Sequence, residues 1–330
     1  MSEVYRLFGS EYSPYSVKVR AYLRYKRVPH EWIKRNASNE AEFKQYAKLP
    51  LVPLVVTPEG EGVQDSTPIM ELIDERHPEP TTHPSDPALR FLSTLIEEYG
   101  DEWGNKIMFH HRWWAEVDQI ATANALARSS APNADDAAIV EMSKAVRERM
   151  TGRGHFVGSS AETAPLIRSY ADRLLAILEP HLATRRYLFG ARPSFGDFGL
   201  AAQLYECAVD PTLGGIMRAR ASKTLDWCFR MLEPHEEGAF ETWTKLEPTL
   251  SPLIENVGKF FLPWSAANAA AIASGRDSFA VELDGKTYRQ APQKYHAKSL
   301  AVLRAKYATV KDRSALDPIL ERAGCRRWFA

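Results

Sequence analysis

Cysteine is scarce in this chain. Only Cys207, Cys228 and Cys325 occur among 330 residues, an odd number at wide spacings and without a CxxC pair. This arrangement excludes a framework of paired disulfides. We therefore expect the chain in a reducing compartment, which points to the cytoplasm.

An excess of charge of either sign is also absent. The sequence has 42 Lys plus Arg and 42 Asp plus Glu, so its formal net charge is zero. This balance removes any chain-wide electrostatic case for nucleic acid or acidic membranes. The first residues, MSEVYRLFGSEY, lack the basic flank and apolar stretch of a secretion signal, and no window approaches the ~20 apolar residues of a membrane span. We expect no nucleic acid and no membrane as a partner.

Hydrophobic residues, in contrast, are plentiful enough for ordinary globular cores. They make up 45% of the chain and charged residues 25%, which excludes wholesale disorder. At roughly 150 residues per domain, a chain of 330 residues should form about two domains, each able to fold without metal or disulfide.

Residues 1–80 have the pattern of a compact α/β unit. Ser13-Pro14 predicts a helix start, because the Ser hydroxyl can cap a free backbone N–H and Pro fits the first helical position. A further polar stretch, also expected to be helical, lies between the second and third strands. We expect strands at 4–8, 30–35, 54–57 and 62–64, and helices at 14–27 and 68–76.

A proline-rich linker precedes a helical domain. Residues 77–87 contain four prolines, and we place the linker at 81–87. From 88 to 259 the apolar patterns are helical almost throughout. Ser194 and Asp197 have the spacing of a capping box in front of the apolar run FGLAAQLYECAV. We therefore expect an all-α domain with a buried helix at this point.

The last residues, 260–330, form an extension of a different character. Alternating apolar residues on both sides of Asp284-Gly285 predict a β-hairpin over 278–290, and helical stretches follow at 296–309 and 316–323. Because an isolated hairpin is only marginally stable, its apolar side chains should pack on the main body. These side chains are Phe279, Val281 and Leu283.

The zero net charge conceals an asymmetry. Residues 286–330 carry 11 Lys plus Arg and 3 Asp plus Glu, a net of +8, so the rest of the chain carries −8. The basic residues are spread out without a block of five, which favours a solvated face or packing against the acidic remainder over a nucleic-acid patch. We expect the extension to cover part of the cleft or a dimer contact.

Four short motifs occur in a fixed order along both domains. They are Ser13-Pro14-Tyr15-Ser16 at the first helix, Val52-Pro53 before the third strand, Gln64-Asp65-Ser66 before the last helix of the α/β unit, and PSFGDFGLAAQL in the helical domain. In this order the motifs resemble the glutathione S-transferase superfamily, over residues 4–255. The resemblance implies an α/β N-terminal thioredoxin-like domain (βαβ-ββα) plus an all-α C-terminal domain, with the hairpin and helices added at the C-terminus. It also implies a homodimer.

The resemblance places Ser13 where the superfamily keeps its catalytic Ser or Cys. In that role the hydroxyl donates a hydrogen bond to the glutathione thiolate and lowers the thiol pKa. The alternative is that Ser13 only caps the first helix. Tyr12, Tyr15 and Ser16 are the nearby substitutes. No Cys occurs in the first domain, which argues against the branches with a cysteine nucleophile.

Two further motifs are implied to bind glutathione. The backbone of Val52, ahead of a cis Pro53, pairs with the cysteinyl unit; on base rates alone a trans bond is favoured. In the motif of Gln64, Asp65 and Ser66, Ser66 with its backbone N–H receives the γ-glutamyl carboxylate and Asp65 meets the α-amine. The alternative is a turn and helix cap, since Asp, Ser and Thr gather at such positions.

Aromatic residues supply the expected substrate pocket. By the resemblance, the helix after the linker helps to wall the site of the electrophile. Trp103 and Trp114, together with Tyr12 and Tyr15, are the candidates for contact with a flat apolar substrate. The alternative for such residues is packing in the core.

No metal is expected. His110 and His111 follow several acidic residues, but adjacent residues point to different sides of a helix and make poor joint ligands. Hydrogen bonding between helices, or exposure at the surface, is the expected role of both.

Together these features predict a glutathione transferase-like enzyme that activates the glutathione thiolate for attack on a hydrophobic electrophile or a peroxide, as in detoxification. Its expected partners are glutathione, as co-substrate, and a small hydrophobic electrophile. The alternative is a non-catalytic glutathione-binding or protein-interaction module on the same fold. Isomerase activity is disfavoured, because Ser13-Pro14-Tyr15 stands where that branch carries Ser-Ser-Cys.

Overall fold

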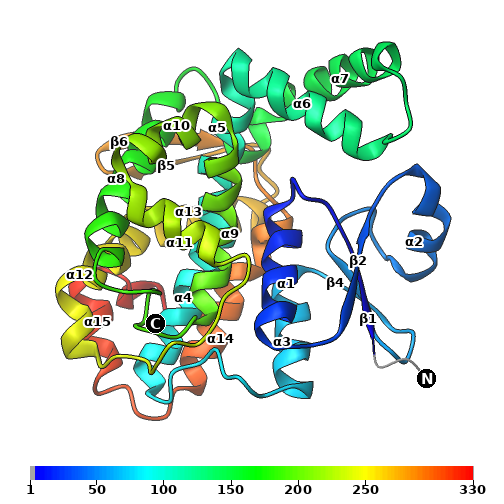
Figure 1. Ribbon diagram of the computed structural model, residues 1–330. Coiled ribbons are helices and arrows are strands. Elements are labelled where there is room, and N and C mark those ends of the chain that lie inside the picture. The colour runs from blue at the N-terminus through cyan, green and yellow to red at the C-terminus, as the bar shows by residue number, and fades with distance from the viewer. Residues whose placement is uncertain (1–3, 330) are drawn as a thin grey trace.

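The computed structural model describes residues 4–329 and has two parts, a small α/β unit and a larger helical body (Figure 1). The order of elements in the unit is the expected one. These elements are β1 (Tyr5–Gly9), α1 (Pro14–Tyr25), β2 (His30–Lys34), η1 (Ala37–Asn39), α2 (Glu40–Tyr46), β3 (Leu54–Val56), β4 (Gly62–Gln64) and α3 (Ser66–Arg76).

The four strands form a mixed sheet in the order β2-β1-β3-β4. β1 runs parallel to β2 and antiparallel to β3, and β3 runs antiparallel to β4. Because side chains alternate along a strand, Leu7 and Val55 face the core shared with α1 and α3, whereas Phe8 packs with Phe43 of α2 on the other face. Helices therefore cover both faces, which confirms the predicted thioredoxin-like unit.

The helical body begins with an almost continuous helical run. The run comprises α4 (Pro87–Tyr99), the π-helical turn η2 (Gly100–Gly104) and α5 (Asn105–Trp114). The expected linker, 81–87, lies in the loop before α4 except for Pro87, the first residue of that helix. None of the helices within residues 4–329 is long and apolar enough to cross a bilayer. The other elements of the body are α6 (Glu116–Ser130), α7 (Asp136–Thr151), η3 (Gly154–Val157), α8 (Ala164–Leu182), α9 (Phe195–Val209), α10 (Pro211–Arg220), α11 (Ser222–Arg230), α12 (Trp243–Asn256) and η4 (Val257–Phe261).

Helix α9 is the buried centre of the body, as its capping-box motif predicts. Ser194 and Asp197 form the box. The Asp197 carboxylate also accepts hydrogen bonds from the Leu188 N–H at 2.8 Å and from Trp227 Nε1 at 2.9 Å. The start of α9 is therefore tied to two other segments of the body.

Helix α9 also carries the contact between the two parts of the molecule. Within the helical body, Gly199 allows α9 to pack closely against α4, since a Cβ at this position would collide with the Glu97 backbone. On the α/β side, Tyr22 of α1 packs edge-on against Phe198, with ring centroids 4.9 Å apart, and against Phe195 at 6.1 Å. A packed interface of this kind fixes how residues of α1, α3 and α4 meet.

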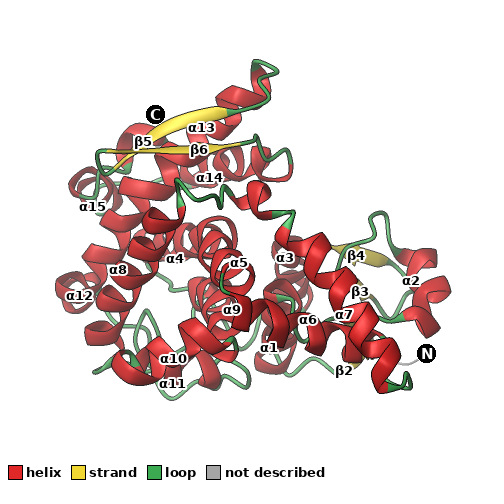
Figure 2. Cartoon of the chain, turned by 90° about the horizontal axis from the view of Figure 1, so that it is seen from above, coloured by secondary structure: helices red, strands yellow, loops and turns green. Residues whose placement is uncertain are grey.

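The C-terminal extension folds onto the helical body. Its hairpin lies along α13 when the molecule is seen from above (Figure 2). The hairpin and both helices are confirmed, except that the expected helix over 296–309 begins as a 3-10 turn. The elements are α13 (Leu262–Ala273), β5 (Phe279–Leu283), β6 (Lys286–Gln290), η5 (Tyr295–Lys298), α14 (Ser299–Thr309), α15 (Leu316–Arg322) and η6 (Arg326–Trp328).

The turn and the packing of the hairpin follow from the sequence. Asp284 and Gly285 have positive φ values of 54° and 72°, which a tight Asp-Gly turn requires. Phe279 and Leu283 are buried and Val281 is half-buried against the core of the helical body. This confirms that the hairpin packs on the main body. The extension and the helical domain, which we divide at residue 259, therefore share one core.

Basic residues of the extension meet acidic residues of the remainder. Lys306 pairs with Glu71 of α3 at 2.6 Å, and Arg322 pairs with Glu247 of α12 at 2.7 Å. Each exposed pair contributes little to stability. The contact with Glu71 nevertheless brings α14 to the α/β unit as well as to the helical body.

Candidate functional site

The N-terminus of α1 holds Ser13, the expected catalytic residue. Pro14 takes the first helical position, and Ser13 Oγ accepts a hydrogen bond from the Ser16 N–H at 3.3 Å, so Ser13 is the N-cap. Its hydroxyl proton has no acceptor among residues 4–329. The oxygen can thus cap the helix while the O–H stays available to a bound anion, and the two interpretations of Ser13 are compatible.

The three hydroxyl residues around Ser13 have different surroundings. Tyr12 is half-buried. The Tyr15 hydroxyl donates to the Asp101 carbonyl at 3.0 Å, and burial raises its pKa well above the ordinary value. Ser16 is fully buried, and within the described part of the chain its Oγ has no partner. Because the Tyr15 hydroxyl is engaged and the Ser16 hydroxyl is shielded, Ser13 is the better placed donor.

The Val52-Pro53 peptide bond is cis, as the resemblance implies. Val52 lies just before β3 and is half-buried, and Pro53 is buried. Neither the N–H nor the C=O of Val52 has a hydrogen-bond partner between residues 4 and 329. A backbone edge left open in this way can pair with an extended peptide-like ligand.

Gln64 does not have the role that the motif implies. Its Oε1 accepts from the N–H groups of Lys48 and Leu49 at 2.7 and 2.9 Å. Its Nε2 donates to the carbonyls of Leu49 and Leu51, both at 2.8 Å. An amide side chain has two donors and two acceptor positions, and all four are used. Gln64 therefore anchors the loop before Val52 and has no capacity left for glutathione.

Asp65 and Ser66 stand at the N-terminus of α3. Asp65 is exposed and has a φ of 81°, a strained conformation for a residue other than glycine. No side chain caps this helix, and the N–H groups of Ser66 and Thr67 have no acceptor in the described chain. Free N–H groups and the helix dipole favour an anion here. This end of α3 suits a carboxylate, with an ammonium group beside Asp65.

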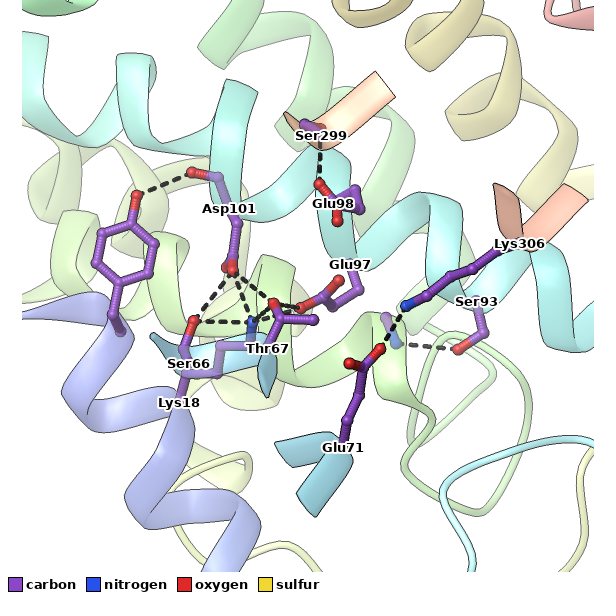
Figure 3. Close-up of polar contacts among 12 residues, drawn as sticks. Lys18, Ser66, Thr67, Glu71, Ser93, Glu97, Glu98, Asp101, Ser299 and Lys306 are labelled. Atoms are coloured by element: carbon purple, nitrogen blue, oxygen red, sulfur yellow. Dashed lines mark hydrogen bonds and ion pairs between the residues drawn. The ribbon is translucent and has the colours of Figure 1, made fainter. Parts of the chain in front are cut away.

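Behind that helix end lies a buried polar group of residues, which we call the Lys18 cluster (Figure 3). Lys18 Nζ donates to Glu97 at 2.5 Å and to Asp101 at 2.6 Å. It also donates to the hydroxyls of Ser66 at 3.2 Å and Thr67 at 3.1 Å. Ser66 Oγ donates in turn to Asp101 at 3.2 Å. Since the Ser66 hydroxyl is engaged within the protein, its backbone N–H is the group left for a ligand.

The Lys18 cluster sets two carboxyl groups against one ammonium. Burial raises the pKa of Asp101 to about 7, although the charge of Lys18 acts in the opposite direction. Burial lowers the pKa of Lys18, but the carboxylates of Asp101 and Glu97 outweigh it and the net change is upward. Lys18 therefore stays charged at neutral pH, whereas the Asp101 carboxyl titrates close to neutrality.

A second buried cluster ties the loop before Ser13 to the helical body. Arg112 of α5 donates to Glu206 at 2.6 Å and to Asp210 at 2.8 Å. It also donates to the Tyr12 carbonyl at 3.0 Å. The fork of guanidinium donors can make all three bonds at once. Arg112 belongs to the helical body and therefore ties Tyr12, the residue before Ser13, to that part of the molecule.

The two candidate tryptophans lie in different surroundings. Trp103 has 0% exposed surface and packs among Tyr170, Phe260 and Trp264. A ring enclosed in the core contacts no substrate, so this placement removes Trp103 from the expected pocket. Trp114, at the end of α5, is 40% exposed and stays available to a substrate.

His110 and His111 make hydrogen bonds within the protein. His110 Nδ1 lies 2.7 Å from Ser159 Oγ, and His111 Nδ1 lies 2.8 Å from the Ile107 carbonyl. Burial lowers the pKa of His110 to about 3. Among residues 4–329, no group of three His, Cys, Asp or Glu side chains is placed to hold a metal ion.

Glu98, beside the Lys18 cluster, predicts a pH dependence of stability. It is buried and accepts a hydrogen bond from the Ser299 hydroxyl of α14 at 2.6 Å. Burial and the charge of Glu97 raise its pKa to about 8, above the ordinary value of 4.5. Between these values the folded chain binds a proton that the unfolded chain has released. The contribution of Glu98 to the free energy of unfolding is therefore fully present below about pH 4.5. It is lost as the pH rises towards 8, at up to ~1.4 kcal/mol per pH unit.

Glu98→Gln should remove this contribution. We expect its free energy of unfolding, measured with urea between about pH 5 and about pH 8, to fall less steeply than that of the wild type. Glu75→Gln changes an exposed glutamate of α3 and is the matched control. A Glu98→Gln chain with the wild-type slope would contradict the assignment.

The sequence interpretation missed Lys18 and Arg112. The acidic partners of these two cations gave a signal in the sequence. Each cation binds two acidic residues that are one helical turn apart in a largely buried segment. These pairs are Glu97 with Asp101 and Glu206 with Asp210. Acidic pairs at such positions demand a buried cation, but they do not say which one.

Comparisons with known proteins match both parts of the chain. A family model described as "Glutathione S-transferase, N-terminal domain" matches residues 7–81, and one described as "Glutathione S-transferase, C-terminal domain" matches residues 133–228. A "Probable glutathione S-transferase" of Solanum tuberosum is 27% identical over 184 residues, which are 54% of this chain and 76% of that protein. Another, of Nicotiana tabacum, is 32% identical over 107 residues, 31% of this chain and 46% of that protein.

Two of the solved structures that match the chain cover 89% and 72% of it. A glutathione S-transferase from Rhodospirillum rubrum is 18% identical, covers 89% of this chain and 99% of its own, and gives a TM-score of 0.43. One from Methylobacterium radiotolerans, in complex with glutathione sulfonate, is 21% identical over 72% of this chain and 99% of its own, with a TM-score of 0.40.

Proposed function

The chain belongs to the glutathione S-transferase superfamily, and on that premise we propose that it binds glutathione at the α/β unit and activates the thiol for attack on a hydrophobic electrophile or a peroxide. One observation carries the proposal. At the N-terminus of α1 the Ser13 oxygen caps the helix, while its proton is unused within residues 4–329.

Thiol chemistry explains why such a donor matters. The glutathione thiol has an unperturbed pKa near ~8.5, so only a small fraction is thiolate at neutral pH. A hydrogen bond from Ser13 Oγ, together with the positive end of the α1 dipole, stabilises the thiolate and lowers that pKa. The thiolate then forms a bond to the electrophilic centre as the leaving group departs with its electron pair.

The rest of glutathione is held by its backbone and charged ends. We assign the cysteinyl unit to the open backbone of Val52. The γ-glutamyl carboxylate is received by the N–H groups of Ser66 and Thr67, and the α-ammonium group by Asp65. The backbone of Val52 and the N–H groups of Ser66 and Thr67 have no hydrogen-bond partner within the described residues, and Asp65 is exposed.

The second substrate and the setting complete the proposal. We place a small hydrophobic electrophile beside Tyr12 and Trp114, whose rings are partly exposed. A homodimer and a role in detoxification follow from the resemblance, a cytoplasmic location follows from the low cysteine content, and all three belong to the same proposal.

Ser13→Ala should raise the pKa of the bound glutathione thiol towards ~8.5, because the thiolate loses its hydrogen-bond donor. Loss of one hydrogen-bond donor to a developing anion lowers kcat by roughly 10²- to 10³-fold. The thiol is titrated by ultraviolet absorbance of the thiolate in complexes of the wild type and the variant. Ser13→Thr keeps the hydroxyl and should keep the low thiol pKa.

A second serine of the same loop provides the control. Ser10 Oγ accepts a hydrogen bond from the Tyr12 N–H at 3.2 Å, so Ser10→Ala removes a side-chain contact of the loop, while the Ser13 hydroxyl and the Ser10 carbonyl that accepts from the Ser13 N–H are retained. Equal thiol pKa values in the wild type and Ser13→Ala remove Ser13 from the proposed role. Binding of glutathione with no turnover on a broad panel of electrophiles supports a non-catalytic module instead.

A further inference from the structure

We propose that Arg112 is a positioning residue for Ser13. From the helical body it fixes the peptide unit that carries Ser13, and so it aims the Ser13 hydroxyl at the glutathione thiolate. This inference rests on the proposed function, since it concerns how the hydrogen-bond donor of that site is held. In this assignment Arg112 touches neither glutathione nor the electrophile, and it acts only through Ser13.

The peptide unit between Tyr12 and Ser13 is held at both of its ends. Its carbonyl oxygen, which belongs to Tyr12, accepts a hydrogen bond from Arg112 Nη1 at 3.0 Å. Its N–H, which belongs to Ser13, donates to the Ser10 carbonyl at 3.2 Å. Because a peptide unit is planar, two such bonds fix its orientation and with it the position of the Ser13 Cα. The bond from Arg112 comes from the helical body, and the bond to Ser10 lies within the loop itself.

The other side of Ser13 is fixed by helix α1. Ser13 has an extended backbone, with a φ of −112° and a ψ of 112°. Its Oγ accepts a hydrogen bond from the Ser16 N–H at 3.3 Å. The hydroxyl oxygen is therefore held between the start of the helix and the peptide unit before it. A change in the orientation of that peptide unit moves the hydroxyl relative to a bound thiolate.

Arg112 is itself held in place by buried partners. Its Nε donates to Asp210 at 2.8 Å, and its Nη2 donates to the carboxylate and the carbonyl of Glu206 at 2.6 and 3.1 Å. Asp210 also accepts from Thr122 Oγ1 of α6 at 3.1 Å. None of the side chains of Arg112, Glu206 and Asp210 is more than 4% exposed. The guanidinium cannot swing away without leaving two buried carboxyl groups unpaired, so its contact with Tyr12 is a rigid one.

The planar guanidinium makes this arrangement possible. Its three nitrogens serve acceptors on three segments, which are the loop before α1, the last turn of α9 and the residue that links α9 to α10. Lysine keeps the positive charge but ends in a single nitrogen, which does not span three such positions. Arg112→Lys is therefore expected to keep a cation beside Glu206 and Asp210 and to lose the contact with the Tyr12 carbonyl.

The test measures the pKa of the bound glutathione thiol in the full-length chain, by ultraviolet absorbance of the thiolate. We expect Arg112→Lys to raise this pKa towards ~8.5 and to lower kcat by about tenfold to 10²-fold. Calorimetry should find S-methylglutathione, which has no thiol, bound as tightly as by the wild type. Arg185→Lys is the matched control, because Arg185 also donates to a carboxylate, that of Glu241, and to a backbone carbonyl, that of Lys245.

A double-mutant cycle separates positioning from support of the fold. Ser13→Ala lacks the hydroxyl that Arg112 places, so adding Arg112→Lys to it should raise the thiol pKa no further. If Arg112→Lys lowers the urea midpoint and leaves the thiol pKa at the wild-type value, Arg112 only stabilises the fold and the inference is overturned. A further rise on top of Ser13→Ala would also overturn it, because Arg112 would then act on the thiol by another route.

A second variant decides the matter if Arg112→Lys does not fold. Arg112→Met combined with Glu206→Gln and Asp210→Asn removes the three buried charges together, and it too should raise the thiol pKa. A wild-type thiol pKa in this variant overturns the inference and leaves the proposed function standing. If the wild-type chain binds no glutathione, or if Ser13→Ala leaves the thiol pKa unchanged, the proposed function fails and the inference fails with it.

Discussion

A chain that ends at Ser274 is expected to accumulate as unfolded or aggregated protein. The removed segment supplies part of the core that it shares with the helical body. Each fully buried apolar side chain contributes about 1.5 to 3 kcal/mol, and a whole domain is stable by only about 5 to 15 kcal/mol. The buried side chains that would be lost include Leu283, Tyr288, Leu300, Leu303, Leu316 and Leu320.

Substitutions at two neighbouring residues of α14 measure the contribution of the extension to stability in a chain that still folds. Leu303 has 0% exposed surface, whereas Val302 is 37% exposed. Leu303→Ala should lower the free energy of unfolding by about 2 to 5 kcal/mol, and Val302→Ala should stay within about 0.5 kcal/mol of the wild type. Urea unfolding measures both values. A soluble truncated chain with the wild-type urea midpoint would show that the extension is an independent appendage.

The features that the sequence predicted are the ones that depend on neighbouring residues. The hairpin follows from Asp284-Gly285 between alternating apolar residues, and the start of α1 follows from Ser13-Pro14. The buried helix α9 follows from a capping box in front of an apolar run. In each case the residues that specify the structure lie within a few positions of one another, so a single sequence contains the whole cause.

Features that depend on distant partners were not predictable from the sequence. Trp103 is enclosed by rings from residues far along the chain, and nothing near it distinguishes a core ring from a substrate contact. Gln64 fills its hydrogen-bonding capacity with the loop 48–51, a contact set by how that loop folds back. Lys18 lies 79 residues before Glu97. These pairings exist only after the helices have packed.

Lys18→Met should produce one of the largest losses of stability available to a single substitution in this protein. Lys18, Glu97 and the contact between them are fully enclosed, with 0% of either side chain exposed. Removing the ammonium group leaves two buried carboxyl groups without a cation, which costs about 3 to 5 kcal/mol. The neutral hydroxyls of Ser66 and Thr67 also donate to these carboxyl groups, but within residues 4–329 Glu97 Oε2 and Asp101 Oδ1 have no hydrogen-bond partner, and no second cation is bonded to either group to replace Lys18.

The sign of the pH dependence identifies the cause of this loss. Without Lys18 the pKa of Asp101, which burial already raises, rises further in the folded state, so the variant should regain stability as the pH falls from about 8 to about 5 and Asp101 takes up a proton. Lys18→Met combined with Glu97→Gln and Asp101→Asn removes the charges together and should restore part of the stability at pH ~8. Lys44→Met, at a lysine whose side chain is 70% exposed, should change little. If Lys18→Met and the triple variant lose the same stability at every pH, the loss comes from packing and not from uncompensated charge, and the Lys18 cluster has been misinterpreted.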